Sequence, residues 1–276
     1  MCGIAGIVQF NEPISIAALK KMTDSLVHRG PDGEGHWLNN KAKVGLGHRR
    51  LSIIDLSENT KQPMHYANNR YTLTFNGEIY NYIELKEELK KKGYSFISES
   101  DTEVLLALYD CKKEKCLQDL DGMFAFAIWD EKEQTLFCAR DRFGEKPFYY
   151  HYLPGKFFAF ASEMKALFSL GIPKSVNNEM LYNFIHSAYH VTNPANRPQT
   201  FYTGISKLPP ATFITVNASL QLAETAYWSL SEVNSNNTLA YEEAKEKFTE
   251  LLYRSVKRRL RSDVPVGSSQ IGRAHV

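Results

Sequence analysis

Met1-Cys-Gly-Ile-Ala-Gly-Ile-Val-Gln-Phe10, at the start of the chain, is the segment that most strongly indicates a fold. Residues 3–10 form a mostly apolar run, which is typical of a buried strand. A small second residue such as cysteine also permits removal of the initiator methionine. Cys2 would then carry a thiol and a free α-amine, which ordinarily titrate near 8.5 and at about 7.7–8.0. The amine can therefore act as the general base for its own thiol. The alternative is a chance cysteine at a disordered start.

Similar short runs recur through the first two thirds of the chain and predict further strands. We expect strands at 3–10, 43–54, 71–76, 123–129, 136–139, 148–152, 157–161 and 211–216. Helical spacing of apolar residues predicts helices over 15–26, 82–92 and 163–170. Asn81 is the expected cap of the second, and the capping box Ser100-Asp-Thr-Glu103 opens another. Many strands with few long helices predict layered sheets covered by helices.

Composition excludes several classes of protein. The chain has 276 residues, 43% of them apolar and 23% charged, with a formal charge of +2, which fits a globular protein with a proper core. Basic residues cluster at 254–261, which we interpret as a solvated helix face and not as a nucleic-acid site. No run approaches the roughly 20 apolar residues that span a bilayer, and no secretory signal precedes the first strand, so a cytoplasmic location is expected.

The cysteines and histidines do not predict a metal site. The four cysteines are Cys2, Cys111, Cys116 and Cys138, and they form neither a disulfide framework nor a zinc-binding pattern. The histidines likewise lack metal-ligand spacing. We expect Cys111, Cys116 and Cys138 to be ordinary structural residues, so only Cys2 is a candidate nucleophile.

Acyl transfer also needs donors for a developing oxyanion. Phe75-Asn-Gly-Glu78 follows a predicted strand and precedes a predicted helix. The Asn76 carboxamide and the Gly77 N–H could supply two such donors. The competing interpretation, which this motif alone favours, is a plain Asn-Gly turn.

An amino acid as substrate would need an anchor at each charged end. Arg50, in His48-Arg-Arg-Leu51, could bind a carboxylate in bidentate fashion. Glu78 and Asp101, each at the start of a predicted helix, could bind an ammonium group. Taken singly, these residues are more simply a surface arginine pair and acids that cap helix N-termini.

Eight motifs in order carry a resemblance to a known family. They are Met1-Cys-Gly-Ile-Ala-Gly6, His28-Arg-Gly-Pro-Asp32, His48-Arg-Arg-Leu-Ser-Ile-Ile-Asp55, Asn76-Gly-Glu-Ile-Tyr-Asn81, Ser100-Asp-Thr-Glu103, Gly122-Met-Phe-Ala-Phe-Ala127, Arg140-Asp-Arg-Phe-Gly-Glu-Lys-Pro147 and Ala161-Ser-Glu-Met-Lys-Ala166. The series resembles the class II glutaminase domain of glutamine-hydrolysing asparagine synthetases and covers roughly residues 2–230. Ser262-Asp-Val-Pro-Val-Gly267 resembles the strand that leads into the synthetase domain.

The resemblance implies an α+β fold, the αββα four-layer sandwich of N-terminal nucleophile hydrolases, followed by the first helix of a truncated α/β synthetase domain. It implies that Cys2 is the nucleophile after loss of Met1 and that Asn76 and the Gly77 N–H form the oxyanion hole. The implied glutamine-binding residues are Arg50 for the α-carboxylate, Glu78 and Asp101 for the ammonium, and the backbone of Leu51, Ser52, Ile53 and Ile54 as pocket lining.

The implied activity is the glutaminase half of a glutamine-dependent asparagine synthetase, in which ammonia from L-glutamine serves the ATP-dependent amidation of aspartate. One alternative is a related amidotransferase that amidates another carboxylate in cell-surface or secondary metabolism. A non-catalytic scaffold is disfavoured because Cys2, Arg50, Asn76 and Asp101 are all present. A simple amidase is disfavoured because anchors for both ends of an amino acid are paired.

The resemblance also divides the chain. We expect the glutaminase domain at 2–212, its end and a linker at 213–240, and the start of a truncated synthetase domain at 241–267, opening with an amphipathic helix over 241–261. The Ser-Gly-Gly-x-Asp-Ser loop that would hold ATP pyrophosphate does not follow Gly267. Residues 268–276 are expected to be a non-native tail, because codons for 270–276 can be chosen that resemble a common sequencing adapter.

Cofactors and partners follow from this division. We expect no cofactor in this part of the enzyme, and ATP and Mg²⁺ in the full-length synthetase. The expected partners are L-glutamine, the chain's own C-terminal synthetase domain and, through that domain, aspartate and ATP. A second copy of the chain is a further candidate partner, whereas nucleic acid and membrane are not.

Overall fold

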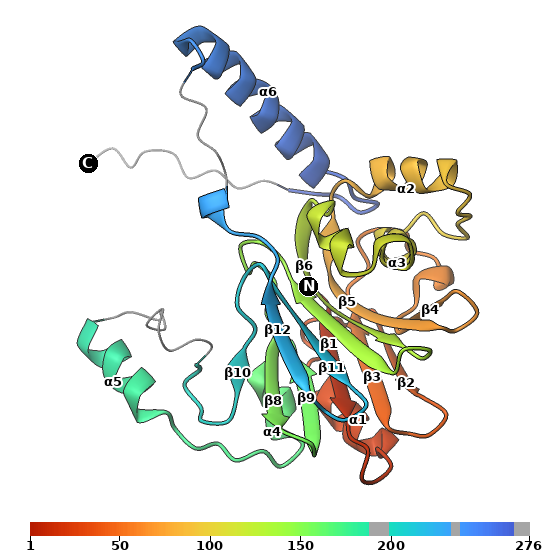
Figure 1. Ribbon diagram of the computed structural model, residues 1–276, viewed down its shortest axis with the longest axis vertical. Coiled ribbons are helices and arrows are strands. Elements are labelled where there is room, and N and C mark those ends of the chain that lie inside the picture. Colours follow the sequence, from red (N-terminus) through yellow and green to blue (C-terminus); the bar gives the residue numbers. More distant parts are fainter. Residues whose placement is uncertain (188–198, 233–237, 268–276) are drawn as a thin grey trace.

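The computed structural model describes residues 1–187, 199–232 and 238–267, and these form two stacked antiparallel sheets of six strands each (Figure 1). The first sheet has the order β10 (Ser206–Lys207), β8 (Tyr149–Leu153), β9 (Phe157–Ala161), β1 (Gly3–Val8), β3 (Val44–Arg50) and β2 (Gly33–Leu38). The second has the order β12 (Leu222–Ala226), β11 (Thr212–Asn217), β7 (Thr135–Arg140), β6 (Gly122–Asp130), β5 (Tyr71–Ile79) and β4 (Met64–Tyr66).

Helices cover the outer face of each sheet. On the first sheet, α1 (Ile16–Asp24) packs on β1 and β3, and α4 (Met164–Phe168) packs on β8 and β9. On the second sheet, α3 (Asp101–Lys112) packs on β4 and β5, and α2 (Tyr82–Lys91) lies beside α3. The αββα sandwich predicted from the sequence is therefore confirmed.

The central strands are apolar throughout because both of their faces are buried. In β1, Ile4 and Val8 belong to the core between the sheets, whereas Ala5 and Ile7 belong to the core under α1 and α4. In β6, residues 125, 127 and 129 face the first sheet and residues 124, 126 and 128 face α3. Alternate side chains point to opposite faces of a strand, so three core layers lie between the four layers of backbone.

Several predicted boundaries need correction. The strand expected over 43–54 ends at Arg50, and the residues after it leave the sheet. β2, β4, β10 and β12 were not predicted. Ser100 caps α3 by accepting a hydrogen bond from the Thr102 N–H at 2.9 Å, but Glu103 binds the backbone of residues 97 and 98 instead of completing a capping box. Asn81 does not cap α2 with its side chain, which instead bonds to the backbone of Asp119 and Asp121.

The described residues also form helices outside these four layers. They are α5 (Asn178–Ser187), three short 3₁₀ helices at Glu58–Thr60, Lys113–Gln118 and Leu230–Glu232, and α6 (Tyr241–Arg259), which projects from the sandwich (Figure 1). No residue of α6 is buried, and its apolar side chains, including Phe248, Leu252 and Val256, are exposed. Within the described ranges, no helix is both long and apolar enough to cross a bilayer. Part of the expected linker (233–237) and the expected tail (268–276) lie outside the described residues.

Candidate active site

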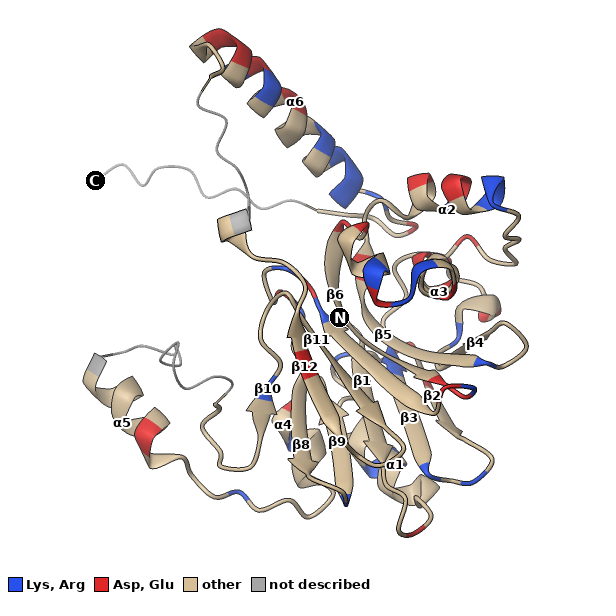
Figure 2. Cartoon of the chain, in the orientation of Figure 1, with Lys and Arg blue, Asp and Glu red and all other residues tan. Residues whose placement is uncertain are grey.

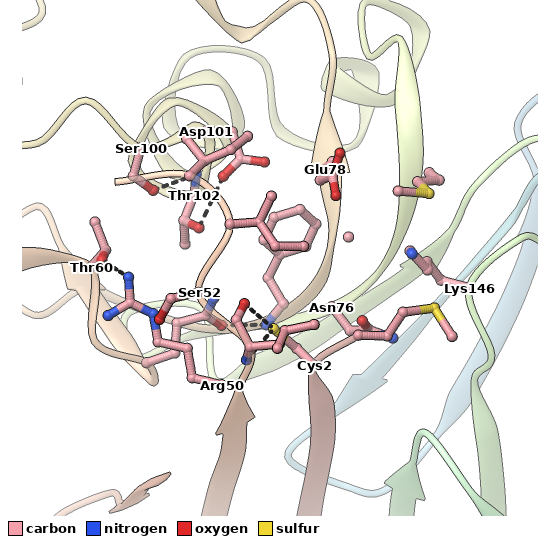
Figure 3. A pocket seen from close by; sticks show the side chains of 18 residues that line it. Cys2, Arg50, Ser52, Thr60, Asn76, Glu78, Ser100, Asp101, Thr102 and Lys146 are labelled. Carbon is pink, nitrogen blue, oxygen red and sulfur yellow. Dashed lines mark hydrogen bonds between the residues drawn. The ribbon is translucent and has the colours of Figure 1, made fainter. Parts of the chain in front are cut away.

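All the predicted site residues line one pocket of about 180 Å³ (Figure 3). They come from four places in the chain: the residue before β1, the end of β3 with the segment that follows it, the end of β5, and the first residue of α3. They are Cys2, Arg50, Leu51, Ser52, Ile53, Ile54, Asn76, Gly77, Glu78 and Asp101.

Cys2 is fixed by the backbone around it. Its carbonyl oxygen accepts a hydrogen bond from Nε of Arg29 at 2.9 Å. Its Sγ accepts one from the Leu51 N–H at 3.3 Å, and its S–H donates to the Leu51 carbonyl oxygen, with Sγ 3.5 Å from that oxygen. Burial raises the pKa of the Cys2 thiol. The thiol therefore needs a base before it can react as a thiolate at neutral pH.

The chain's own amino group is a candidate for that base. Met1 lines the pocket, and burial lowers the pKa of its α-amine from the ordinary value. A lowered pKa favours the neutral amine, which is the form that accepts a proton. Loss of Met1 would place an α-amine on Cys2 itself, two bonds from the carbon that carries the thiol.

Asn76 presents an unused donor to the pocket. The residue is only 1% exposed, and its buried Nδ2 has no hydrogen-bond partner among the described residues. Asn76 lies within β5 on the same strand face as Thr72 and Thr74. This face points toward the first sheet, since the Thr74 hydroxyl donates to the Gly47 carbonyl of β3. A buried donor without a partner costs about 1–3 kcal/mol. A ligand oxygen at this position would recover that cost.

The Gly77 N–H also faces the pocket, as the register of β5 shows. Gly77 lies opposite Phe124 of β6, but the N–H and the carbonyl of Phe124 both bond to Asp141 and so point away from β5. Gly77 and Phe124 are therefore a non-hydrogen-bonded pair, and the Gly77 N–H points to the opposite edge of β5. At that edge the neighbouring outward N–H groups, of Phe75 and Ile79, donate to Gln62 and Asp101.

Gly77 must be glycine at this point of the strand. A Cβ on Gly77 would lie 2.3 Å from the carbonyl oxygen of Met123 and 2.8 Å from Cα of Phe124. Any side chain would therefore push β5 away from β6. The close approach of these backbones sets the position of the Gly77 N–H relative to Cys2.

Arg50 reaches the pocket wall opposite the acids (Figure 3). Its guanidinium donates to the carbonyl oxygens of Asp55 at 2.6 Å and Ser57 at 3.2 Å, and to the hydroxyl of Thr60. These contacts use three of the five N–H groups of a guanidinium. The side chain is thus held in place while donors remain that could bind a carboxylate.

The His28-Arg-Gly-Pro-Asp32 motif holds the segment 51–54 and the end of β3 in place through backbone contacts. The Asp32 carboxylate accepts a hydrogen bond from the Ser52 N–H at 2.9 Å. Gly30 lies against the backbone of Arg49, where a Cβ would meet the carbonyl carbon at 2.3 Å. The motif therefore has a supporting role, and the side chain of His28 contacts Glu163 and not the pocket.

Glu78 and Asp101 make the pocket attractive to a cation. Asp101 is buried, and its carboxylate accepts hydrogen bonds from the Ile79 N–H at 2.9 Å and the Thr102 hydroxyl at 3.3 Å. Burial raises the pKa of Asp101 to about 7, and the charge of Glu78 contributes to the rise. Burial also raises the pKa of Glu78. A bound ammonium group would favour the ionised form of both acids.

The structure adds residues that the sequence did not single out. Lys146 is only 5% exposed and lines the pocket, and burial lowers its pKa while the acidic groups of Glu78 and Cys2 oppose that change. It belongs to the motif Arg140-Asp-Arg-Phe-Gly-Glu-Lys-Pro147, but nothing in that motif indicates a role for the lysine. Gln62 orders the edge of β5 through the Phe75 N–H, and no signal in the sequence pointed to it.

The described residues contain no cluster of three or more His, Cys, Asp or Glu side chains that could hold a metal ion. The arrangement instead combines a thiol, a nearby amine, two outward-facing N–H donors and separate anchors for a carboxylate and an ammonium group. Chemically, these groups suit nucleophilic attack on the side-chain amide of an amino acid.

Comparisons with known proteins agree with this description. A family model described as "Glutamine amidotransferase domain" matches residues 1–228. The chain is 39% identical to asparagine synthetase [glutamine-hydrolyzing] 1 of Bacillus subtilis, over 97% of this chain and 41% of that protein. It is 32% identical to amidase chry2 of Gibberella zeae, over 96% of this chain and 40% of that protein.

A solved structure shows the same fold. Glutamine phosphoribosylpyrophosphate amidotransferase of B. subtilis superposes with a TM-score of 0.61 at 22% identity, over 82% of this chain and 49% of that one. The chain thus spans less than half the length of each of these three proteins.

Proposed function

The chain belongs to the family of glutamine amidotransferase domains, and from this premise we propose that it hydrolyses L-glutamine to glutamate and ammonia with Cys2 as nucleophile. One observation carries the proposal: the Cys2 thiol lines the same pocket as the buried Nδ2 of Asn76, which has no partner in the part of the chain that the structure describes. An oxyanion formed by attack of the thiol would give that amide donor its missing acceptor.

Binding is assigned to charged groups on opposite walls. The Arg50 guanidinium takes the glutamine α-carboxylate, and Glu78 and Asp101 take the α-ammonium. The backbone of residues 51–54 lines the pocket between them. Fixing both charged groups on the α-carbon directs the side-chain amide toward Cys2, which lowers the entropic cost of reaching the transition state.

Acylation begins with proton transfer from the thiol to the α-amine of a mature N-terminal Cys2. The thiolate attacks the carboxamide carbon, a C–S bond forms, and the carbonyl electrons move to the oxygen. Asn76 Nδ2 and the Gly77 N–H donate to that oxyanion. The ammonium of Cys2 then protonates the leaving nitrogen, the C–N bond breaks, and ammonia departs from a thioester.

Deacylation reverses these roles. Water attacks the thioester carbon while the α-amine takes its proton, and the oxyanion again lies against Asn76 and Gly77. The C–S bond then breaks, the proton returns to sulfur, and glutamate leaves. The Cys2 amine thus acts in turn as base, acid, base and acid, and no side chain besides the Cys2 thiol need carry a proton.

For the longer protein, we propose that the ammonia serves ATP-dependent amidation of aspartate in a C-terminal synthetase domain, with Mg²⁺ accompanying the ATP. The name of the B. subtilis relative supports this acceptor. The Gibberella relative is named an amidase, and that name gives no acceptor for the ammonia. The alternative that the ammonia serves another carboxylate therefore stays a prediction. A cytoplasmic location and a homodimer stay predictions.

The nucleophile is tested by following glutamate release from L-glutamine by the unaltered chain, Cys2→Ala and Cys111→Ala. Cys111 is a free cysteine of intermediate exposure that does not line the pocket, so it controls for loss of a thiol. We expect Cys2→Ala to lose all release above background and Cys111→Ala to keep it. Release that survives Cys2→Ala would disprove the assignment of the nucleophile.

The substrate class is tested with glutamine analogues. Glutaramate lacks the α-ammonium group, and N-acetylglutamine lacks its charge. Both should be poor substrates because the pocket acids lose their partner. Equal turnover of glutaramate and glutamine would instead favour a simple amidase.

A further inference from the structure

The chain returns to the active site after α6. The helix points away from the sandwich, but its basic C-terminal end approaches α2 (Figure 2). Arg258 donates to the carboxylates of Glu84 at 3.3 Å and Asp121 at 3.0 Å, and Arg261 donates to Glu84 at 2.6 Å. These ion pairs hold the C-terminal end of α6 against α2 and place residues 261–263 beside the loop that follows β3.

Asp263 then bonds to the loop that forms one pocket wall. Its N–H donates to the Ile53 carbonyl at 3.0 Å, and its carboxylate accepts a hydrogen bond from the Asp55 N–H at 2.7 Å. One residue therefore holds the backbone on both sides of Ile54. Ile53 and Ile54 both line the pocket.

Asp55 connects the Asp263 contact to the proposed substrate-binding residues Arg50 and Asp101. Its carbonyl oxygen accepts the bond from Arg50, and its carboxylate accepts one from the Glu99 N–H at 2.9 Å, two residues before Asp101. Its φ of 50° is in the left-handed region, which a non-glycine residue adopts at some cost. The conformation of Asp55 therefore depends on the hydrogen bonds that surround it, including the one to Asp263.

We propose that Asp263 is a positioning residue for glutamine, which holds the loop at 51–55 in its pocket-forming conformation and so ties glutamine affinity to the segment that follows α6. The inference rests on the proposed glutaminase function. Asp263 lies outside the matched family domain at 1–228 and does not line the pocket. Movement of this segment would thus alter the site without contact with the substrate.

Without the Asp263 acceptor, the loop would spend part of its time in conformations that cannot bind glutamine. The apparent affinity falls in proportion to the fraction of molecules that remain competent. For Asp263→Ala we expect the Kd and KM for glutamine to rise about five- to tenfold, at the lower end of typical coupling between sites. The kcat should change less than about twofold, because the bound state has the same reacting groups.

Two variants separate positioning from a general effect on folding. Asp263→Asn keeps an oxygen that can accept the Asp55 N–H bond, so it should restore affinity to near that of the unaltered chain. Glu250→Ala removes an exposed acid of α6 that pairs only with Arg254, at 3.8 Å, among the described residues, and should change nothing. Thermal unfolding of all variants should coincide within a few degrees.

The measurements are glutamine binding by calorimetry in a Cys2→Ala background, steady-state glutaminase kinetics, and hydrogen exchange of the Asp55 amide. Faster exchange and weaker binding in Asp263→Ala, both reversed in Asp263→Asn, would support the proposal. Unchanged binding in Asp263→Ala, or an Asn variant as impaired as the Ala variant, would overturn it. If the unaltered chain neither binds nor hydrolyses glutamine, the proposed function fails instead, and the exchange data still judge whether Asp263 holds the loop.

Discussion

Replacement of Asp101 by Asn should raise the free energy of unfolding and at the same time weaken the binding of glutamine. Asp101 is buried, and its carboxylate has hydrogen bonds only from Ile79 and Thr102 among the described residues. Its pKa rises from 3.8 to about 7 on folding, chiefly because burial disfavours the charge. A rise of this size corresponds to about 4 kcal/mol between the two ionisation states.

The sign of the pH dependence follows from where the proton is held. Between about pH 4 and pH 7 the folded protein keeps the Asp101 proton and the unfolded chain does not, so the free energy of unfolding falls as the pH rises through this range. Above the folded pKa it levels off. The carboxamide introduced by Asp101→Asn would remain neutral at every pH, and its oxygen could still accept the Ile79 N–H bond.

Urea unfolding of Asp101→Asn and of the unaltered chain at pH 5 and pH 8.5 checks this. The advantage of the variant should grow by about 2–3 kcal/mol between the two conditions. Its KM for glutamine at pH 8.5 should rise about 10- to 100-fold, because a charge-assisted hydrogen bond to the ammonium is lost. A stability difference that is equal at both pH values would refute the reasoning about the buried carboxyl group, and an unchanged KM would refute its role as an anchor.

Three further outcomes are expected. Asn76→Ala should lower kcat about 10²- to 10³-fold with little change in the Kd for glutamine, since it removes an oxyanion donor; a larger effect on binding than on kcat in steady-state and calorimetric data would contradict that role. Gly77→Ala should destabilise the fold by about 1–3 kcal/mol in urea, because its Cβ would overlap Met123 and the strands must separate; unchanged stability would show that β5 yields without cost. Protein that retains Met1, identified by intact mass, should release glutamate about 10²- to 10⁴-fold more slowly than protein that begins at Cys2, and equal rates would exclude the Cys2 amine as base.

The parts of the fold that could be predicted are those where pattern and burial agree. β1 and β6 are buried on both faces, so their apolar runs were plain in the sequence. β2 is Gly-Glu-Gly-His-Trp-Leu and largely half-exposed, and β12 is mostly exposed, so neither carries such a run. Their pairing is imposed by β3 and β11 and not by their own composition.

The site shows the same division between local and tertiary information. The Asn76-Gly77 pair, taken alone, favours a turn, but it lies inside β5 because β6 continues to pair with it. Of the two arginines after His48, Arg49 forms ion pairs with Asp24 and Glu34 on the outer side, as a surface arginine would. Arg50, the next residue, points the other way and lines the pocket. Because side chains alternate along a strand, Arg49 and Arg50 must point to opposite faces. Only the tertiary structure shows which of these faces lines the pocket.

The brevity of β4 has a consequence for how such a site could be lost. The N–H groups at the free edge of a strand can pair with another strand. Here Pro63, which has no N–H to donate, precedes Met64 and stops β4 short of the end of β5. An alteration that let β4 continue alongside β5 as far as Gly77 would satisfy that amide with a neighbouring carbonyl. The Gly77 N–H could then no longer donate to an oxyanion. Activity would be lost because a strand became longer, although every reactive side chain would be unchanged.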